Sequence, residues 1–365
     1  MYKRILEQRK LPGILVHTDG RPVTGESWPE RRKEIRTLLE NELFGHLPDE
    51  PFIRKSETVR EENRHFLGGK AIYRDVEITV TLRDTPFSWH VICAIPKAEK
   101  PVPVFVMPSF TKLLPFDTLP VEEICDGGYG VCCFDYQTVT KDNEDFRDGL
   151  AGIFYPDGKR GPHDGGKIAI WAWAASRVLE AVCRFPEIDP KRISVVGHSR
   201  LGKTALWAGA QDERFSAVIS VQSGCGGAAL ARGNTGEKIR DITTNFPFWF
   251  APAYAGYADR EALMPFDQHF LLALTAPRPL YVTSAASDLW ADPLNEYLDA
   301  LAVTPVYQLL GMKGVEDVEA LSDSVALHTG AVGYSRRIGG HFFSREDWQR
   351  VICFLDQRTS RTKES

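Results

Sequence analysis

The spacing of hydrophobic residues alternates along the chain between the period of a helix and the alternation of a strand. Residues 29–46 place apolar side chains at helical spacing behind a proline in the first turn, which predicts an amphipathic helix. Alternating segments near 67–82 and 88–95 predict an antiparallel hairpin. The pattern further predicts strands at 103–108, 130–136, 192–197, 215–221, 280–284 and 333–338, and helices at 168–182, 292–301 and 345–356.

This alternation of strands and helices predicts an α/β fold with a mostly parallel central sheet and helices on both faces. Parallel strands buried on both sides give short, nearly continuous apolar runs, as seen here. We expect a single domain over residues 1–365. It would comprise an N-terminal helix and hairpin at 25–100, a core at 101–230 and 269–357, and a lid-like, aromatic-rich insertion at 231–268.

One short segment carries the strongest indication of chemistry. A β-branched run at 193–196 precedes Ser199, and a helix-forming run at 204–210 follows it. A strand, a sharp turn with serine at its apex and a helix form the nucleophile elbow of an α/β-hydrolase. Gly197 and Gly202 supply the small residues that this strained turn needs, although the second glycine lies one place later than in G-x-S-x-G. The segment therefore predicts an α/β-hydrolase fold.

A serine nucleophile needs a base, and the base needs a carboxylate that holds it. In α/β-hydrolases these residues follow in the order serine, acid, histidine. Asp288 comes after the strand at 279–284, and His341 comes after the last strand. We therefore predict that Ser199, Asp288 and His341 form a catalytic triad. The alternatives are that Ser199 or Asp288 caps a helix and that His341 lies in a surface loop. For the helix at 292–301, Asp292 before a proline is a better cap than Asp288.

The oxyanion hole of this fold uses two backbone N–H groups. One belongs to the residue after the nucleophile, here Arg200, and the other to the loop after the third strand, here 107–112. Pro108 has no N–H, so we expect Ser109 or Phe110 to donate. Such donors often supply the largest single catalytic contribution.

The composition of the chain limits which partners it could bind and in which compartment it could act. A net charge of −5 without a basic stripe argues against nucleic acid. The chain has seven cysteines, an odd number, and most of them lie in apolar runs, which argues against a disulfide framework and favours a reducing compartment. Residues 1–10 lack the apolar core of a signal peptide, and no apolar stretch could span a membrane. We expect a cytoplasmic protein without metal or cofactor, although a processed secreted chain would look the same.

Five stretches of the sequence match one known family. They are Gly197–Lys203, Ser223–Leu230, Ala276–Pro279, Asp288–Pro293 and Gly339–Trp348. On these stretches the chain resembles the glucuronoyl esterases, a carbohydrate esterase family, and in particular its bacterial branch. The family cleaves the ester between 4-O-methyl-glucuronic acid on xylan and an alcohol of lignin. The resemblance implies that the Arg200 side chain polarises the ester carbonyl, that Lys203 binds sugar hydroxyls and that Trp290 lines the uronate pocket.

The residue chemistry supports a sugar site independently of that resemblance. Lys203 lies one helical turn after Ser199, on a similar face, and an ammonium group suits hydroxyl ligands. A lysine on the helix surface is the alternative. Trp249 offers a face for a sugar ring, although its aromatic neighbours favour a place in the core of the lid. Glu237 is a further candidate for binding sugar hydroxyls.

The sequence departs from the family pattern at one position. Many members carry the triad acid after the strand that follows the elbow helix, just before Ser-Gly, where this chain has Gln222. A neutral amide cannot stabilise an imidazolium as a carboxylate does, so the acid role is assigned to Asp288. We expect His198, next to the nucleophile, to pack or support the site rather than to catalyse.

The leading hypothesis is a serine esterase that hydrolyses glucuronoyl esters through an acyl-enzyme. An acetyl or acyl esterase on xylan oligosaccharides would use the same triad with a different pocket. A catalytically inactive carbohydrate-binding homologue is the alternative from another class, and the intact order of Ser199, Asp288 and His341 argues against it. The predicted ligand is a small-molecule or oligosaccharide uronate ester, with neither nucleic acid nor membrane as partner.

Overall fold

The computed structural model describes residues 1–49, 52–111 and 119–361, and over these residues the chain forms a ten-stranded mixed sheet. The strands are β1 (Phe52–Phe66), β2 (Ala71–Leu82), β3 (Thr85–Pro96), β4 (Val102–Ser109), β5 (Gly130–Asp135), β6 (Ile188–His198), β7 (Val218–Val221), β8 (Leu280–Ala285), β9 (Val325–Leu327) and β10 (Val332–Arg337). Their order across the sheet is β1-β2-β3-β5-β4-β6-β7-β8-β10-β9.

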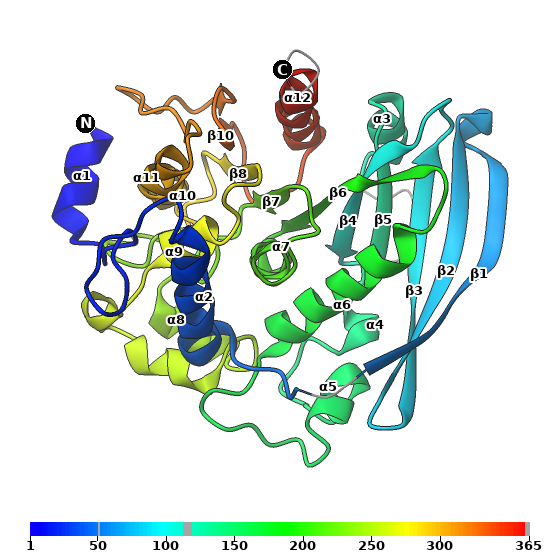
Figure 1. Cartoon of the computed structure of the whole chain (residues 1–365), viewed down its shortest axis with the longest axis horizontal. Helices are drawn as coiled ribbons and strands as arrows, with labels where there is room; N and C mark the ends of the chain where they lie inside the picture. The colour runs from blue at the N-terminus through cyan, green and yellow to red at the C-terminus, as the bar shows by residue number, and fades with distance from the viewer. Residues whose placement is uncertain (50–51, 112–118, 362–365) are drawn as a thin grey trace.

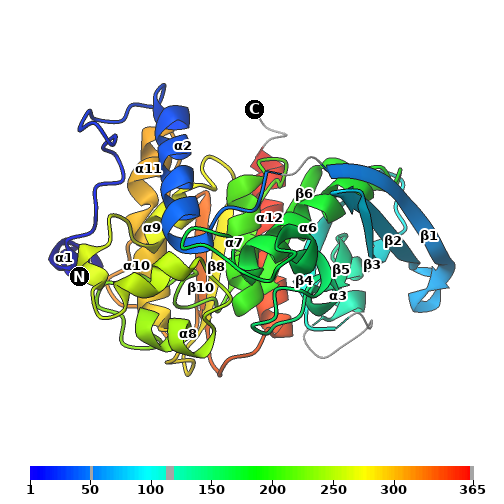
Figure 2. The same cartoon turned by 90° about the horizontal axis from the view of Figure 1, so that it is seen from below.

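Helices cover both faces of the sheet (Figures 1 and 2). They are α1 (Tyr2–Arg9), α2 (Trp28–Leu39), α3 (Val121–Asp126), α4 (Tyr136–Val139), α5 (Gly149–Phe154), α6 (Lys167–Val182), α7 (Arg200–Gln211), α8 (Ile239–Asn245), α9 (Gln268–Ala273), α10 (Pro293–Ala302), α11 (Thr304–Leu309) and α12 (Arg345–Arg361). Shorter turns lie at Glu40–Phe44, Leu67–Gly69, Pro252–Tyr257 and Glu261–Leu263. Helices α6, α7 and α10 contribute to the core on one face, and α3 and α12 to the core on the other.

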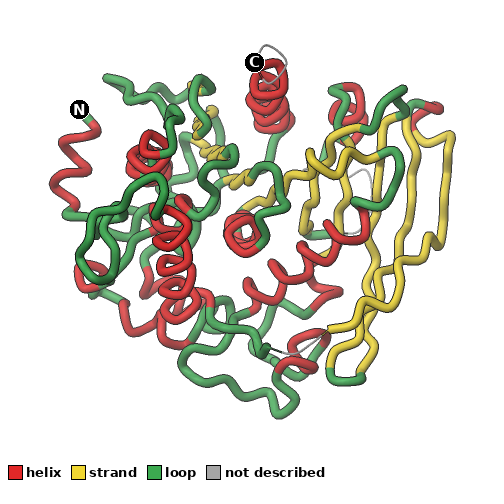
Figure 3. Tube along the Cα trace, in the orientation of Figure 1, coloured by secondary structure: helices red, strands yellow, loops and turns green. Residues whose placement is uncertain are grey.

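The parallel part of the sheet agrees with the sequence pattern. Strands β5, β4, β6, β7, β8 and β10 run parallel, whereas β1, β2 and β3 pair antiparallel at one edge. Figure 3 shows these long edge strands in yellow on the side of the molecule away from the N-terminus. All residues of β4, β7 and β8 are buried, as expected for strands covered on both faces. The fold is that of an α/β-hydrolase, as the elbow sequence predicted.

Several elements differ from the sequence prediction. Strand β1 was not predicted, because its stretch 56–65 is almost entirely polar or charged and mostly exposed, as is common for an edge strand. Helix α1 was not predicted either. The helix expected at 29–46 is α-helical only to Leu39 and continues as a π-helical turn at Glu40–Phe44. Helix α12 extends beyond the expected residue 356, to Arg361.

The 231–268 insertion is tied to the body of the protein by backbone hydrogen bonds. The N–H of Lys167, at the start of α6, donates to the Phe248 carbonyl at 2.8 Å, and the N–H of Ala251 donates to the Leu43 carbonyl at 2.9 Å. Phe250 and Tyr254 are buried in the same core as α6 and α7. The insertion therefore packs as part of the molecule rather than as a detached flap. Within the described residues, no helix has the length and apolar content needed to cross a membrane.

Candidate active site

Ser199 occupies a strained turn between β6 and α7. Its backbone has φ 59° and ψ −125°, a left-handed conformation that is rare for residues other than glycine. Its N–H donates to the Val221 carbonyl at the end of β7, at 2.8 Å. A Cβ atom at Gly197 would lie 1.9 Å from the Leu201 carbonyl oxygen, so only glycine fits there. The Ser199 side chain makes no helix-capping hydrogen bond, which argues against a capping role.

Asp288 and His341 form a direct pair at the carboxyl ends of β8 and β10. His341 Nδ1 lies 2.6 Å from Asp288 Oδ2, and because an ionised carboxylate can only accept, the ring N–H donates. The Asp288 side chain is 4% exposed and the His341 side chain 43%. The N–H of Ser287 donates to the Gly339 carbonyl at 2.9 Å and thereby ties the two loops together. Asp292 caps α10 by accepting from the Asn295 N–H, as the sequence predicted.

The third contact of a triad is not formed in this arrangement. Among the described residues, no hydrogen bond joins the Ser199 hydroxyl to the His341 ring. The His341 ring nevertheless lies beside the elbow, with its centroid 4.6 Å from that of His198. Catalytic hydrogen bonds are often long in ligand-free enzymes and tighten when substrate binds. The structure thus brings the acid and the base together next to the serine.

Gln222, at the family's other acid position, holds the loop that carries His341. Its amide nitrogen donates to the Phe342 carbonyl at 3.1 Å, and its amide oxygen accepts from the Phe342 N–H at 2.9 Å. The same oxygen accepts from Nε2 of His198 at 3.3 Å. Burial lowers the pKa of His198 to about 3, so this ring is neutral at physiological pH. Gln222 and His198 therefore support the site, as expected for His198.

Asp142 is a central residue of the site that the sequence did not reveal. Its carboxylate, which is 7% exposed, pairs with the guanidinium of Arg200. It also accepts from the hydroxyl of Tyr136 at 2.8 Å and from the indole N–H of Trp249 at 2.7 Å. Three elements far apart in the chain thus converge on one carboxylate. Asp142 lies in a polar loop stretch without periodicity, so no sequence signal distinguishes it from its neighbours.

Trp249 supports the guanidinium of Arg200. The indole is 3% exposed and stacks on Phe246 with ring centroids 3.8 Å apart. The guanidinium carbon of Arg200 lies 4.7 Å from the centroid of the Trp249 ring. Such burial favours the alternative that Trp249 belongs to the core of the insertion rather than forming an open platform for a sugar.

Lys203 and Glu237 are both buried, which excludes the surface alternative for Lys203. The Lys203 ammonium donates to the Ser223 carbonyl at 2.6 Å. Burial lowers the pKa of Lys203 and raises the pKa of Glu237, and each of the two charges partly opposes the shift of the other. The Glu237 N–H donates to the carbonyl of Trp290 at 2.8 Å. The Trp290 side chain itself is exposed, so its indole is available to a ligand.

The predicted oxyanion loop is described only in part. Phe110 is 39% exposed, and its ring centroid lies 5.6 Å from that of Tyr136 and 6.1 Å from that of His198. The hydroxyl of Ser109 donates to backbone carbonyls, including that of Phe134 at 3.3 Å. Position 112 of the loop lies outside the described residues. The assignment of Phe110 as a donor to the oxyanion stays a prediction.

One group of possible metal ligands occurs in the described part of the chain, remote in sequence from the serine. Ligand atoms of His17, Glu30 and Glu34 lie within 4.8 Å of one another. Glu34 pairs with Arg31, and Glu30 pairs with Arg21. Because these arginines already compensate the carboxylates, the group is explained as an ion-pair cluster.

A serine in a strained strand-to-helix turn, followed in the chain by an Asp–His pair at the ends of later parallel strands, is typical of an α/β-hydrolase. Residues 78–311 match the family model described as glucuronyl esterase, fungi. Carbohydrate esterase MZ0003, from an unknown prokaryotic organism, is 33% identical over 95% of this chain and 89% of its own length. The 4-O-methyl-glucuronoyl methylesterase 1 of Wolfiporia cocos is 26% identical over 83% of this chain and 72% of its own.

A solved structure gives the same result in three dimensions. The glucuronoyl esterase from Solibacter usitatus superposes with a TM-score of 0.88 at 35% identity, covering 95% of this chain and 97% of the other. The chain therefore belongs to the glucuronoyl esterase family, whose members are carboxylic ester hydrolases.

Proposed function

We propose that this protein hydrolyses esters of glucuronic acid or its 4-O-methyl derivative, with Ser199 as nucleophile, His341 as base and Asp288 as the acid that orients the base. The observation that carries this proposal is the 2.6 Å contact between the buried Asp288 carboxylate and His341 Nδ1, beside a serine elbow. Relatives that carry the name 4-O-methyl-glucuronoyl methylesterase support the substrate class.

The reaction would proceed in two acyl transfers. The Ser199 hydroxyl attacks the ester carbonyl while His341 Nε2 takes its proton, and the Asp288 carboxylate stabilises the imidazolium that forms. The tetrahedral intermediate then collapses, and His341 returns the proton to the departing alcohol. This leaves the uronic acid as an ester of Ser199. Water, deprotonated by His341, attacks this acyl-enzyme and releases the uronic acid and the free serine.

Arg200 stabilises the negative charge of the tetrahedral intermediate. Its backbone N–H follows the nucleophile, where this fold places an oxyanion donor. Its guanidinium is held between the Asp142 carboxylate and the Trp249 ring, so the charge is oriented before substrate arrives. Such preorganisation avoids a rearrangement in the transition state and thereby lowers the barrier.

Replacing Asp142 with asparagine tests this role of Arg200. We expect kcat for glucuronate esters to fall by about 10- to 100-fold, since the lost charge-assisted hydrogen bond is worth about 1.5–3 kcal/mol. The KM should change less, because the oxyanion exists only in the transition state. Asp145→Asn, in the same loop but with its carboxylate 55% exposed, is the matched control. Equal effects of both variants on kcat would argue against a specific role for Asp142.

Lys203→Ala tests the sugar-binding side of the site. We expect KM for glucuronoyl esters to rise by about tenfold or more, and KM for small aryl acetates to change little, because the lost contact is with sugar hydroxyls. Lys203→Met keeps the apolar stem inside the buried site and separates loss of charge from loss of packing. Parallel losses on both substrate types would remove Lys203 from sugar recognition.

The substrate class is tested by comparing benzyl D-glucuronate with an acetylated xylo-oligomer as substrates of the purified protein. We expect kcat/KM to favour benzyl glucuronate. Preference for the acetylated oligomer would instead indicate an acetyl esterase with the same triad. No turnover of either substrate, together with no labelling by a fluorophosphonate probe, would indicate a non-catalytic homologue.

A further inference from the structure

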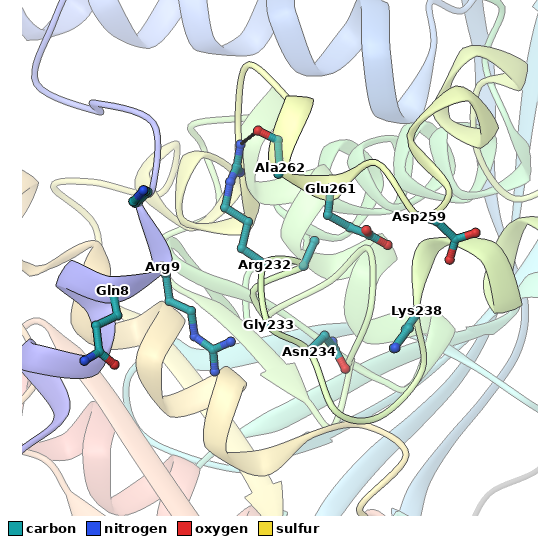
Figure 4. A pocket seen from close by; sticks show the side chains of 11 residues that line it. Gln8, Arg9, Arg232, Gly233, Asn234, Lys238, Asp259, Glu261 and Ala262 are labelled. Atoms are coloured by element: carbon teal, nitrogen blue, oxygen red, sulfur yellow. Dashed lines mark hydrogen bonds between the residues drawn. The ribbon is translucent and has the colours of Figure 1, made fainter.

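A second cavity lies between helix α1 and the 231–262 segment (Figure 4). Its volume is about 610 Å³, within the range of about 300–1,000 Å³ that is usual for small-molecule sites. Gln8 and Arg9 line it on the side of α1, and Asn234, Lys238 and Glu261 line it on the other. The triad residues do not line it, so it is separate from the site described above.

Arg9 is the central residue of the cavity lining. Its Nε is buried without a hydrogen-bond partner, and no carboxylate of the described residues pairs with its guanidinium. The guanidinium rests directly on Gly233, where an added Cβ would lie 0.9 Å from Nη1 of Arg9. Figure 4 shows the guanidinium directed toward Gly233 and Asn234. The positive charge of Arg9 thus lies in the cavity without a carboxylate of the described residues to neutralise it.

The other charges around the cavity leave an excess of positive charge. Lys10 and Lys238 form no ion pair with any described carboxylate. Arg232 is already saturated by the Asp267 carboxylate and by backbone carbonyls such as that of Met264. These contacts make Arg232 part of the wall rather than a ligand-binding group.

Of the two acidic side chains that line the cavity, only one is free to bind a ligand. Asp259 is neutralised by Arg240, whereas Glu261 forms no ion pair among the described residues. A guanidinium without a counterion pairs with a carboxylate, for which its planar fork is the best match. A free carboxylate such as that of Glu261 accepts hydrogen bonds from hydroxyls. It also repels the two charges of sulfate more strongly than the single charge of a uronate. The combination fits a molecule with one carboxylate and several hydroxyls.

The cavity shares its wall with the candidate active site. The segment that supplies Gly233, Asn234 and Lys238 also supplies Glu237, which lies buried beside Lys203. The hydroxyl of Thr235 donates to Asp292 at 3.0 Å and thereby fixes this segment to the loop that follows Asp288. A sugar bound in the cavity would therefore lie next to the segment that carries Glu237, the candidate for binding the hydroxyls of the ester substrate.

We propose that this cavity binds the carboxylate of an unesterified uronic acid, through Arg9 with Lys238 and Lys10. Glu261 and Gln8 would bind the hydroxyls of the same sugar. The identity of the ligand rests on the proposed function, because hydrolysis of a glucuronate ester releases a free glucuronate. The active site takes the neutral ester, and this cavity takes the charged acid.

The test is a titration of the wild-type protein with sodium D-glucuronate, followed by the amide NMR signals of Gly233 and Asn234. We expect saturable shifts of both signals, no such shifts with D-glucose, and at least about a tenfold weaker affinity in Arg9→Gln, as for loss of one charge-assisted contact. Arg4→Gln, which removes an exposed charge from the same helix away from the cavity, is the matched control and should bind as wild type. Lys238→Gln, on the opposite wall, should also weaken binding and does not depend on the fold of α1.

Two results would overturn the proposal. One is an affinity for glucuronate that is unchanged in both Arg9→Gln and Lys238→Gln. The other is equal binding of sodium sulfate, which would show a non-selective anion site. Hydrolysis of benzyl glucuronate, measured on the same variants, should equal that of the wild type. If the wild-type protein does not hydrolyse that ester at all, the proposed function fails, while the titration still decides whether the cavity binds a uronate.

Discussion

Replacement of Ser199 by alanine is expected to abolish hydrolysis of glucuronate esters while leaving fold and sugar binding intact. Removing the nucleophile of a serine triad lowers kcat by on the order of 10⁶. Alanine is smaller than serine by one oxygen atom, and the Ser199 side chain makes no helix-capping hydrogen bond that the change would remove. The measurement is kcat for benzyl glucuronate, together with thermal unfolding to confirm the fold.

A neighbouring serine provides the control for this variant. Ser287 is exposed in the loop just before Asp288, and Ser287→Ala should keep activity near that of the wild type. Retention of more than about one hundredth of wild-type kcat in Ser199→Ala, once contamination is excluded, would show that Ser199 is not the nucleophile.

Asp288→Asn is expected to lower kcat by about 10³- to 10⁴-fold, because an amide neither fixes the tautomer of His341 nor stabilises its cation. The variant keeps the shape of the buried side chain, so KM should change much less than kcat. Thermal unfolding should be measured alongside, to confirm that the variant keeps the fold. Near-wild-type kcat in Asp288→Asn would contradict the assignment and direct attention to Asp292 or Glu296.

Gln222 offers a sharp comparison with Asp288. The side-chain amide of Gln222 forms hydrogen bonds with the backbone of Phe342 and with His198, and not with the His341 ring. We therefore expect Gln222→Ala to cost far less activity than Asp288→Asn. For the same reason, Gln222→Glu should restore little activity in the Asp288→Asn background. Substantial recovery in that double variant would show that a carboxylate at position 222 reaches the same imidazole.

The parts of the candidate site that could be predicted from the sequence are those that depend on local pattern. The elbow at Ser199 is encoded within a few residues, since the strand, the two glycines and the helix all lie within 193–210. Asp288 and His341 could be predicted because each lies a few residues after a predicted strand, and parallel strands bring their carboxyl ends to one edge of the sheet. The family motifs at the same positions supported both assignments.

The parts that the sequence did not predict depend on contacts between distant segments. Asp142 meets Arg200 and Trp249 only through the fold, and its own loop has no pattern that marks it. The buried ammonium of Lys203 finds its hydrogen-bond partner in the Ser223 carbonyl, twenty residues further along the chain. The cavity beside Arg9 requires α1 to pack on Gly233, and α1 has no sequence signal strong enough to predict a helix.

The central claim is that a glucuronoyl group passes through Ser199. It is tested most directly by acid-quenching the wild-type protein during turnover of benzyl D-glucuronate and mapping the acylated peptide by mass spectrometry. The account predicts a glucuronoyl ester on Ser199 that disappears when the substrate is exhausted. A glucuronoyl group on another residue, or steady hydrolysis without any acylated peptide, would contradict it.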